Sequence, residues 1–196
     1  MPLYRHYKHE LVHIHIPKTG GTSITRACEQ HGAIANFMTK RSFAQCGGVP
    51  PQHMDIRTTK TFFDLNKIPA FAVVRDPWHR TISEFVWRQQ PLKWKFLNSF
   101  LKEMLLNTDH ARTQNHFLPQ HKFVNEDVKL FRYESNWREM EQYIGDKLRF
   151  KNFDITFREQ VRQIYKTPPI HEHIDSETKK LWEDLYKEDL ELYHSL

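Results

Sequence analysis

"HIHIPKTGGTSIT", residues 13–25, runs from a β-branched segment through a glycine pair into a helical pattern. Residues Leu11–Ile16 have the composition of a short strand, which Pro17 ends. After the glycine pair, Thr22–Gln30 has the apolar spacing of a helix. A strand, a tight turn and a helix bring several backbone N–H groups and the positive end of the helix dipole to one point. The stretch therefore predicts an anion site.

The order of residues in this stretch differs from that of the nucleotide-triphosphatase loop, G-x-x-x-x-G-K-S/T, where the lysine follows the last glycine. Here Lys18 precedes Gly20 and Gly21, which permit positive φ angles and a close approach of the backbone to a ligand. Thr22 and Ser23 can cap the helix or donate hydroxyl groups to phosphate oxygens. Lys18 is expected at the far end of the ligand, against a bridging or transferring oxygen. The alternative is a plain strand–turn–helix corner with a solvated lysine.

Length and composition favour one folded domain over residues 1–196. The chain is 39% hydrophobic with a net charge of +5, which suits anionic partners but is equally compatible with a role in solubility. Its two cysteines, Cys28 and Cys46, are expected to be free thiols rather than a disulfide framework or a metal site. No apolar run is long enough to span a membrane, so we expect a soluble, cytoplasmic chain without a membrane partner, although a chain trimmed of an anchor would look the same.

The rest of the chain alternates strand and helix patterns. Ala70–Val74 is an uninterrupted apolar run, which is typical of a strand covered on both faces. Asp76 and Pro77 then predict the start of a helix that reaches Arg88 or Gln89. The other expected elements are helices at Thr58–Leu65, 93–107, Asn136–Ile144 (ended by Gly145) and Ser176–Tyr193 (capped by Ser176), and a strand at Val128–Phe131. This alternation predicts an α/β, three-layer fold of the P-loop type, with a central parallel sheet flanked by helices.

A second motif, "FAVVRDPWHRTISEF", covers residues 71–85. It places Arg75 at the end of a strand and Ser83 on the helix that follows, where Arg80 and Ser83 share a face. An arginine and a hydroxyl in this arrangement can bind a second phosphate. The alternative interpretation is a helix cap with Arg80 in a surface ion pair.

Together the two motifs resemble those of a known family. "HIPKTGGTSI" resembles the 5′-phosphosulfate loop of sulfotransferases, and "VRDPWHRTISEF" is similar to their 3′-phosphate motif, R-D/N-P-x-x-R-x-x-S. Their order and separation match the carbohydrate-type members, including compact bacterial and viral ones. The later segments "HFLPQHKFV", "LFRYESNWREMEQYIG" and "YKEDLELY" are similar as well, so that the resemblance covers most of the chain.

The resemblance implies that the donor is 3′-phosphoadenosine 5′-phosphosulfate (PAPS) and that the reaction is an in-line transfer of its sulfuryl group to an acceptor hydroxyl. The motifs suggest that this hydroxyl belongs to a carbohydrate, and a small alcohol or a tyrosine is the alternative. It assigns Arg75 and Ser83 to the 3′-phosphate and Lys18 to the leaving oxygen. The residues expected to cradle the 5′-phosphosulfate are Pro17, Lys18, Thr19, Gly20, Gly21, Thr22 and Ser23. No metal is implied.

The acceptor hydroxyl needs a general base, and histidine is suited to this role near neutral pH. The chain has 13 histidines, so position must select among them. His53, between the two donor motifs, resembles the family's catalytic histidine. His116 and His121 are the alternatives, since they flank Gln120, and we expect Gln120 and His116 to shape the acceptor site.

Two further interpretations concern other histidines and the tryptophans. His13 and His15 alternate onto one strand face, but the sequence places no third ligand beside them, so no metal site is expected. Trp78, Trp87 and Trp94 are expected to be core residues rather than substrate platforms.

Two other functions are compatible with parts of the pattern. A nucleotide kinase or other P-loop phosphotransferase would need magnesium and a triphosphate, and the position of Lys18 disfavours it. A non-catalytic protein that binds nucleic acid or an anionic glycan would suit the positive charge, but the basic residues are scattered rather than clustered in a stripe. We therefore expect a nucleotide donor and a hydroxyl acceptor, and no nucleic-acid partner. The oligomeric state is not readable from the sequence.

Overall fold

The computed structural model describes residues 1–88, 93–107, 109–110, 113–156, 169 and 172–196. Its sheet has the strand order β3-β1-β2-β4-β5. The strands are β1 (Leu3–His6), β2 (His9–Ile14), β3 (Ile34–Asn36), β4 (Ala70–Val74) and β5 (Val128–Arg132). β2, β4 and β5 are parallel, whereas β1 is antiparallel to both β2 and β3. The predicted α/β fold is confirmed: the sheet is mixed, with parallel central strands and the antiparallel pairings of β1 and β3 at one side.

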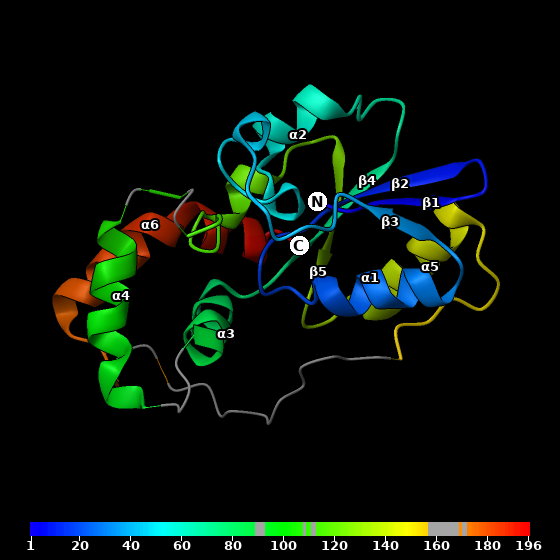
Figure 1. Ribbon diagram of the computed structural model, residues 1–196. Helices are drawn as coiled ribbons and strands as arrows, with labels where there is room; N and C mark the ends of the chain where they lie inside the picture. Colours follow the sequence, from blue (N-terminus) through cyan, green and yellow to red (C-terminus); the bar gives the residue numbers. More distant parts are fainter. Residues whose placement is uncertain (89–92, 108, 111–112, 157–168, 170–171) are drawn as a thin grey trace.

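Helices cover both faces of this sheet (Figure 1). In the described part of the chain they are α1 (Gly21–Gln30), α2 (Ile56–Phe62), α3 (Pro77–Arg88), α4 (Leu97–Leu106), α5 (Trp137–Leu148) and α6 (Ser176–His194). Short 3₁₀ turns lie at Ala44–Cys46, Pro51–His53, Trp94–Phe96 and Gln120–Phe123. None of the described helices is long and apolar enough to cross a membrane.

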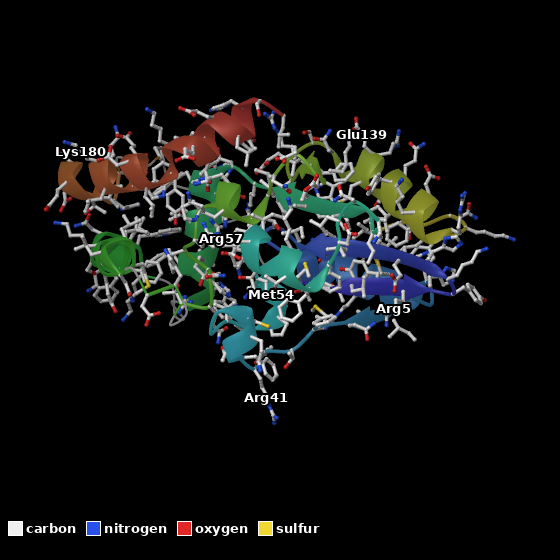
Figure 2. The ribbon with its side chains drawn as sticks, turned by 90° about the horizontal axis from the view of Figure 1, so that it is seen from above. Arg5, Arg41, Met54, Arg57, Glu139 and Lys180 are labelled. Atoms are coloured by element: carbon white, nitrogen blue, oxygen red, sulfur yellow. The ribbon has the colours of Figure 1, made fainter. Side chains whose placement is uncertain are left out.

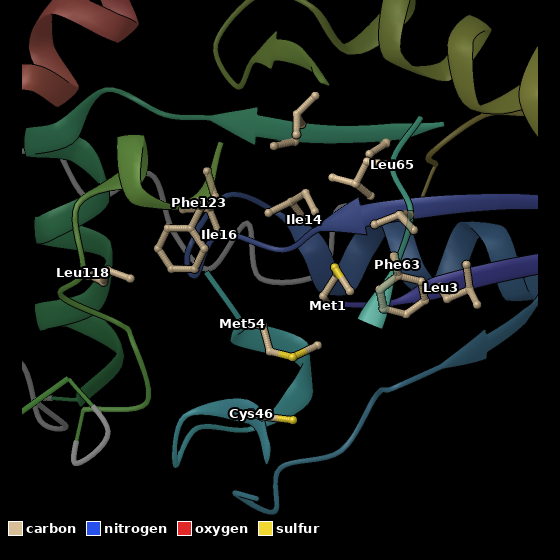
Figure 3. Packing of buried hydrophobic residues seen from close by; sticks show 14 of the residues in the cluster. Met1, Leu3, Ile14, Ile16, Cys46, Met54, Phe63, Leu65, Leu118 and Phe123 are labelled. Atoms are coloured by element: carbon tan, nitrogen blue, oxygen red, sulfur yellow. The ribbon is translucent and has the colours of Figure 1, made fainter. Parts of the chain in front are cut away.

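The two faces of the sheet bury alternate side chains of β4, which is why its sequence is apolar throughout. Ala70, Ala72 and Val74 pack into a cluster covered by the segment before α2 and by the turn at Gln120–Phe123. Met54 and Phe123 belong to this cluster (Figure 3). On the other face, Phe71 and Val73 pack with apolar residues of α1 and α5. β4 is therefore a central strand that is covered on both faces.

A third cluster lies beside the sheet and joins α3, α4 and the segment before α6. Its buried members include Phe85 on α3, Leu101 on α4, and Phe117. Trp182 of α6 donates to the Thr81 hydroxyl of α3 at 3.0 Å, so α6 packs across the same group. In the view from above, Glu139 on α5 and Lys180 on α6 lie at the periphery (Figure 2). The clusters leave the carboxyl ends of β2, β4 and β5 to be covered by loops.

Several local expectations differ from the structure. The sequence did not predict β1 and β3. The Asp175 side chain, rather than that of Ser176, caps α6 by accepting from the Thr178 amide. Gly145 does not end α5, which continues to Leu148. The expected cap of α3 is present, since Asp76 accepts from the His79 amide at 2.8 Å, and Arg88 is the last described residue of that helix. Gln89 lies outside the described residues.

Candidate active site

The loop after β2 turns sharply at the carboxyl edge of the sheet. Lys18 has a φ of 70° and Gly20 a φ of 85°, so the chain passes twice through the left-handed region. The Thr19 hydroxyl is buried and donates to the Ile16 carbonyl at 2.8 Å, which closes the turn. The Gly20 carbonyl accepts the amide of Ile24 and begins α1. The loop residues named in the sequence analysis, Pro17–Ser23, thus form the expected strand–turn–helix corner.

Packing against an aromatic ring explains the glycine at position 21, and a positive φ with close aromatic contacts explains the one at position 20. A Cβ at Gly21 would lie 2.2 Å from the His15 imidazole, so a larger residue cannot occupy this position unless His15 moves. A Cβ at Gly20 would lie 3.0 Å from Trp137 and 3.2 Å from Tyr133. The loop backbone is therefore held between His15 on one side and two aromatic residues, which follow β5, on the other.

Arg75 joins the second motif to this loop. Its Nη1 donates to the Lys18 carbonyl at 3.0 Å, and its guanidinium lies 4.5 Å from the centre of the Tyr133 ring. Burial lowers the pKa of Arg75, and its buried Nε has no hydrogen-bond acceptor within the described part of the chain. A desolvated guanidinium with an unused donor is suited to bind an anion.

Gln120 binds the backbone of Arg75 with both ends of its amide. Its Oε1 accepts the Arg75 N–H at 3.0 Å, and its Nε2 donates to the Arg75 carbonyl at 2.8 Å. The buried Asp189 carboxylate of α6 in turn accepts a hydrogen bond from the backbone N–H of Gln120 at 2.7 Å. In this geometry Gln120 positions Arg75, and its expected place in the acceptor site stays a prediction.

Arg80 is buried and holds two loops together. Its Nε donates to the Pro17 carbonyl at 3.1 Å, and its Nη2 donates to the carbonyls of His116 and Leu118 at 2.9 and 3.0 Å. It is therefore not the surface ion pair that the sequence left open. Ser83 lies one turn further along α3 and is half-buried.

The structure brings three histidines into a row beside the loop. The ring centres of His15 and His53 are 5.2 Å apart, and those of His53 and His116 are 4.8 Å apart. His53 is buried and its Nδ1 lies 3.1 Å from the Gln114 carbonyl. A carbonyl only accepts, so Nδ1 carries the proton and Nε2 is the acceptor nitrogen. Burial, together with the charge of His116, lowers the pKa of His53 well below its ordinary value.

Of the other residues expected in the site, Lys18 lies near the histidine row, whereas His121 does not belong to it. The ring of His116 stacks on Trp87, with centres 5.4 Å apart, and Lys18 Nζ lies 5.1 Å from the centre of the same indole. Trp87 is half-exposed, so it is not the core residue that we expected. His121 instead contacts Asp189 at 2.8 Å.

Sequence reasoning missed four residues of the site: Glu84, Tyr133, Trp137 and Asp189. Tyr133 had a usable signal, because it directly follows β5, whose carboxyl end lies beside that of β4. Glu84 and Asp189 had none, since charged residues on helices are usually solvated.

The hydrogen-bond donors and charges around the loop Pro17–Ser23 are suited to bind an anion rather than a cation. It consists of backbone N–H groups at the start of α1, with the Lys18 and Arg75 side chains. Across the described residues, no group of three or more His, Cys, Asp or Glu side chains is arranged to hold a metal ion.

Comparison with protein families agrees with this geometry. The model of the Sulfotransferase family matches residues 2–194, and the chain therefore belongs to the sulfotransferase family. Searches of the curated proteins and of the solved structures returned no significant match. Membership makes the chain a transferase of sulfuryl groups, for which a nucleotide donor and a hydroxyl acceptor are implied.

The contact between Gly21 and His15 predicts that the effect of Gly21→Ala on the free energy of unfolding depends on whether His15 is present. Gly21→Ala should destabilise the chain by about 1–3 kcal/mol, because the added methyl group must displace a buried ring. In a His15→Ala background the same change should be neutral or stabilising, since alanine is the better helix former. Urea unfolding of the four proteins measures the coupling, and additive effects would refute the contact.

Buried imidazoles predict a loss of stability in mild acid. Burial lowers the pKa of His13 to about 3, while its value in the unfolded chain is near 6.5. The unfolded chain therefore binds the proton first, and stability falls as the pH drops below about 6.5. His13→Gln should reduce the loss of unfolding free energy between about pH 7.5 and 5.5 by roughly 1.4 kcal/mol. Curves of equal slope for wild type and variant would contradict this account.

Proposed function

We propose that the chain transfers the sulfuryl group of PAPS to a hydroxyl group of a carbohydrate acceptor. The loop Pro17–Ser23 binds the 5′-phosphosulfate, and Arg75 with Ser83 binds the 3′-phosphate. Residues 1–196 act as one catalytic domain, and the reaction uses no metal.

The observation that carries the proposal is the hydrogen bond from Arg75 to the Lys18 carbonyl, at 3.0 Å. This bond brings the two motifs, 57 residues apart, to the same edge of the sheet. A donor with phosphate groups at both ends of a ribose needs two such cationic positions side by side. A nucleotide triphosphate bound in the P-loop manner needs instead a lysine after the glycines and a magnesium ligand.

The roles of Lys18 and His53 follow from the charge of the lysine and the tautomer of the imidazole. The acceptor oxygen forms a bond to sulfur as the bond from sulfur to the 5′-phosphate oxygen breaks, and Lys18 stabilises the charge on the leaving oxygen. His53 takes the hydroxyl proton on Nε2, the nitrogen that its bond to Gln114 leaves as an acceptor. The lowered pKa of His53 keeps the ring neutral, and hence able to accept a proton, at neutral pH.

Donor recognition is tested with 3′-phosphoadenosine 5′-phosphate (PAP), the desulfated donor. PAP should raise the melting temperature more than ATP with magnesium does. Arg75→Ala should weaken PAP binding, measured by calorimetry, by roughly 10–100-fold, because a charge-assisted contact is lost.

Arg132→Ala is a matched control for Arg75→Ala. Arg132 also stacks on a tyrosine, at 4.4 Å from the ring centre of Tyr193. Its buried Nε likewise has no hydrogen-bond partner among the described residues. It ends β5 and donates to the Tyr193 carbonyl, so its loss should leave PAP affinity nearly unchanged. Equal losses in both variants, or preference for ATP with magnesium, would reject the donor assignment.

The catalytic roles are tested by turnover with labelled PAPS and a panel of sugar acceptors. His53→Ala should lower kcat by roughly 10²–10⁴-fold with PAP affinity intact, because only the proton acceptor is removed. Lys18→Ala should also lower kcat more than it weakens PAP binding. Unchanged turnover of His53→Ala would exclude this residue as the base.

A further inference from the structure

Glu84 is a buried carboxylate on α3 that the proposed reaction does not yet use. It is 1% exposed, and it accepts from His116 Nδ1 at 2.7 Å and from Arg88 Nε at 2.5 Å. Burial acts to raise the pKa of Glu84, but the hydrogen bond from His116 and the charge of Arg88 outweigh it and lower the pKa overall. Glu84 is therefore an anion at neutral pH, and it is held against an imidazole.

The contacts of His116 fix both the tautomer and the orientation of its ring. A carboxylate only accepts, so His116 carries a proton on Nδ1, and Nε2 is the acceptor nitrogen of the neutral ring. Arg80 holds the His116 carbonyl at 2.9 Å, and Trp87 stacks on the ring at 15° between planes. The side chain of His116 is only 10% exposed. The position of the His116 ring is therefore fixed by three contacts: with Glu84, with Arg80 through its backbone carbonyl, and with Trp87.

His53 and His116 differ in how well they can hold a positive charge. The two ring centres are 4.8 Å apart. An imidazolium at His53 would be buried against the neutral Gln114 carbonyl, whereas one at His116 lies against the Glu84 carboxylate. Of the two rings, His116 is the better place for a proton that leaves the acceptor.

We propose that His116 is a second acid–base residue of the sulfuryl transfer and that Glu84 is its positioning residue. This inference rests on the proposed function. As the bond from the acceptor oxygen to sulfur forms and the bond to the 5′-phosphate oxygen breaks, Nε2 of His53 takes the hydroxyl proton. The proton then passes from Nε2 of His53 to Nε2 of His116, where it is held. The Glu84 carboxylate balances the imidazolium, which returns the proton to solvent after the nucleotide leaves.

The test is Glu84→Gln, in which the amide oxygen can still accept from His116 Nδ1 while the negative charge is lost. We expect kcat to fall roughly 10–100-fold, with the acceptor KM and the PAP affinity within about twofold of wild type. The acidic limb of the kcat–pH profile should move to lower pH, because the imidazolium loses its anion. The other groups that face His116 or its neighbours are unchanged in this variant: Arg80, Arg88, His53 and Lys18. Glu84→Asp should recover part of the lost kcat.

Glu188→Gln is the matched control, since Glu188 also faces a histidine, His121, at 3.4 Å, but is largely exposed on α6. It should keep the wild-type kcat and pH profile. If Glu84→Gln does so too, the proposal is wrong. If Glu84→Gln does not fold, His116→Gln replaces it, since Glu84 then keeps Arg88; wild-type kcat in that variant overturns the proposal, and a loss of 10–100-fold with normal PAP affinity supports it.

A readout that needs no acceptor separates this inference from the proposed function. The imidazole ¹⁵N spectrum, assigned by the signal lost in His116→Gln, should show His116 protonated on Nδ1 at neutral and higher pH. A ring protonated only on Nε2 overturns the Glu84–His116 pair even if the enzyme is active. A wild-type protein that binds no PAP and transfers no sulfuryl group overturns the proposed function, and the acid–base role of His116 with it.

Discussion

The Arg80 guanidinium is the contact on which the geometry of the site depends. It is 3% exposed and donates to three backbone carbonyls that belong to two segments, Pro17 and 116–118. Removing a cation from water costs several kcal/mol unless its donors are satisfied, so the two segments are held where their carbonyls point at this group. Glu84, one turn later on α3, places a negative charge in the same buried region. The donor loop and the His116 segment are consequently positioned by one helix.

The parts of the fold that the sequence predicts are those whose pattern is local. β4 is apolar on both faces and α3 begins with an aspartate and a proline, so both could be recognised from their own residues. The β1–β2 hairpin could not, because Tyr7, with a φ of 52°, takes the place where a glycine or asparagine usually marks the turn. β3 has three residues, of which Ile34 is exposed, and so carries no alternating pattern.

One part of the candidate site could be predicted from a general rule: the carboxyl ends of parallel strands meet at one edge of the sheet, where ligands bind. That rule, applied to β2 and β4, brings Lys18 and Arg75 together, as the structure does. It does not say which side chains pair beyond the edge of the sheet. Gln120 meets Asp189 across 69 residues, and Glu84 meets His116 across 32, through the packing of α3 and α6. Such pairs depend on tertiary contacts that no spacing along the chain encodes.

The chemical groups of the site fall into two sets that differ in charge. Lys18 and Arg75, with the first amides of α1, provide the positive potential that an anionic donor needs. The neighbouring imidazoles of His15 and His53 are buried. Burial lowers both pKa values, and the charge of His53 lowers that of His15 further, as the charge of His116 does for His53. Were these rings charged, they would strengthen the binding of the donor, but they could not accept a proton. Burial thus keeps proton acceptors beside fixed cations at neutral pH. Among the three imidazoles of the row, and within the described part of the chain, His116 is the one whose charged form a carboxylate, that of Glu84, can stabilise.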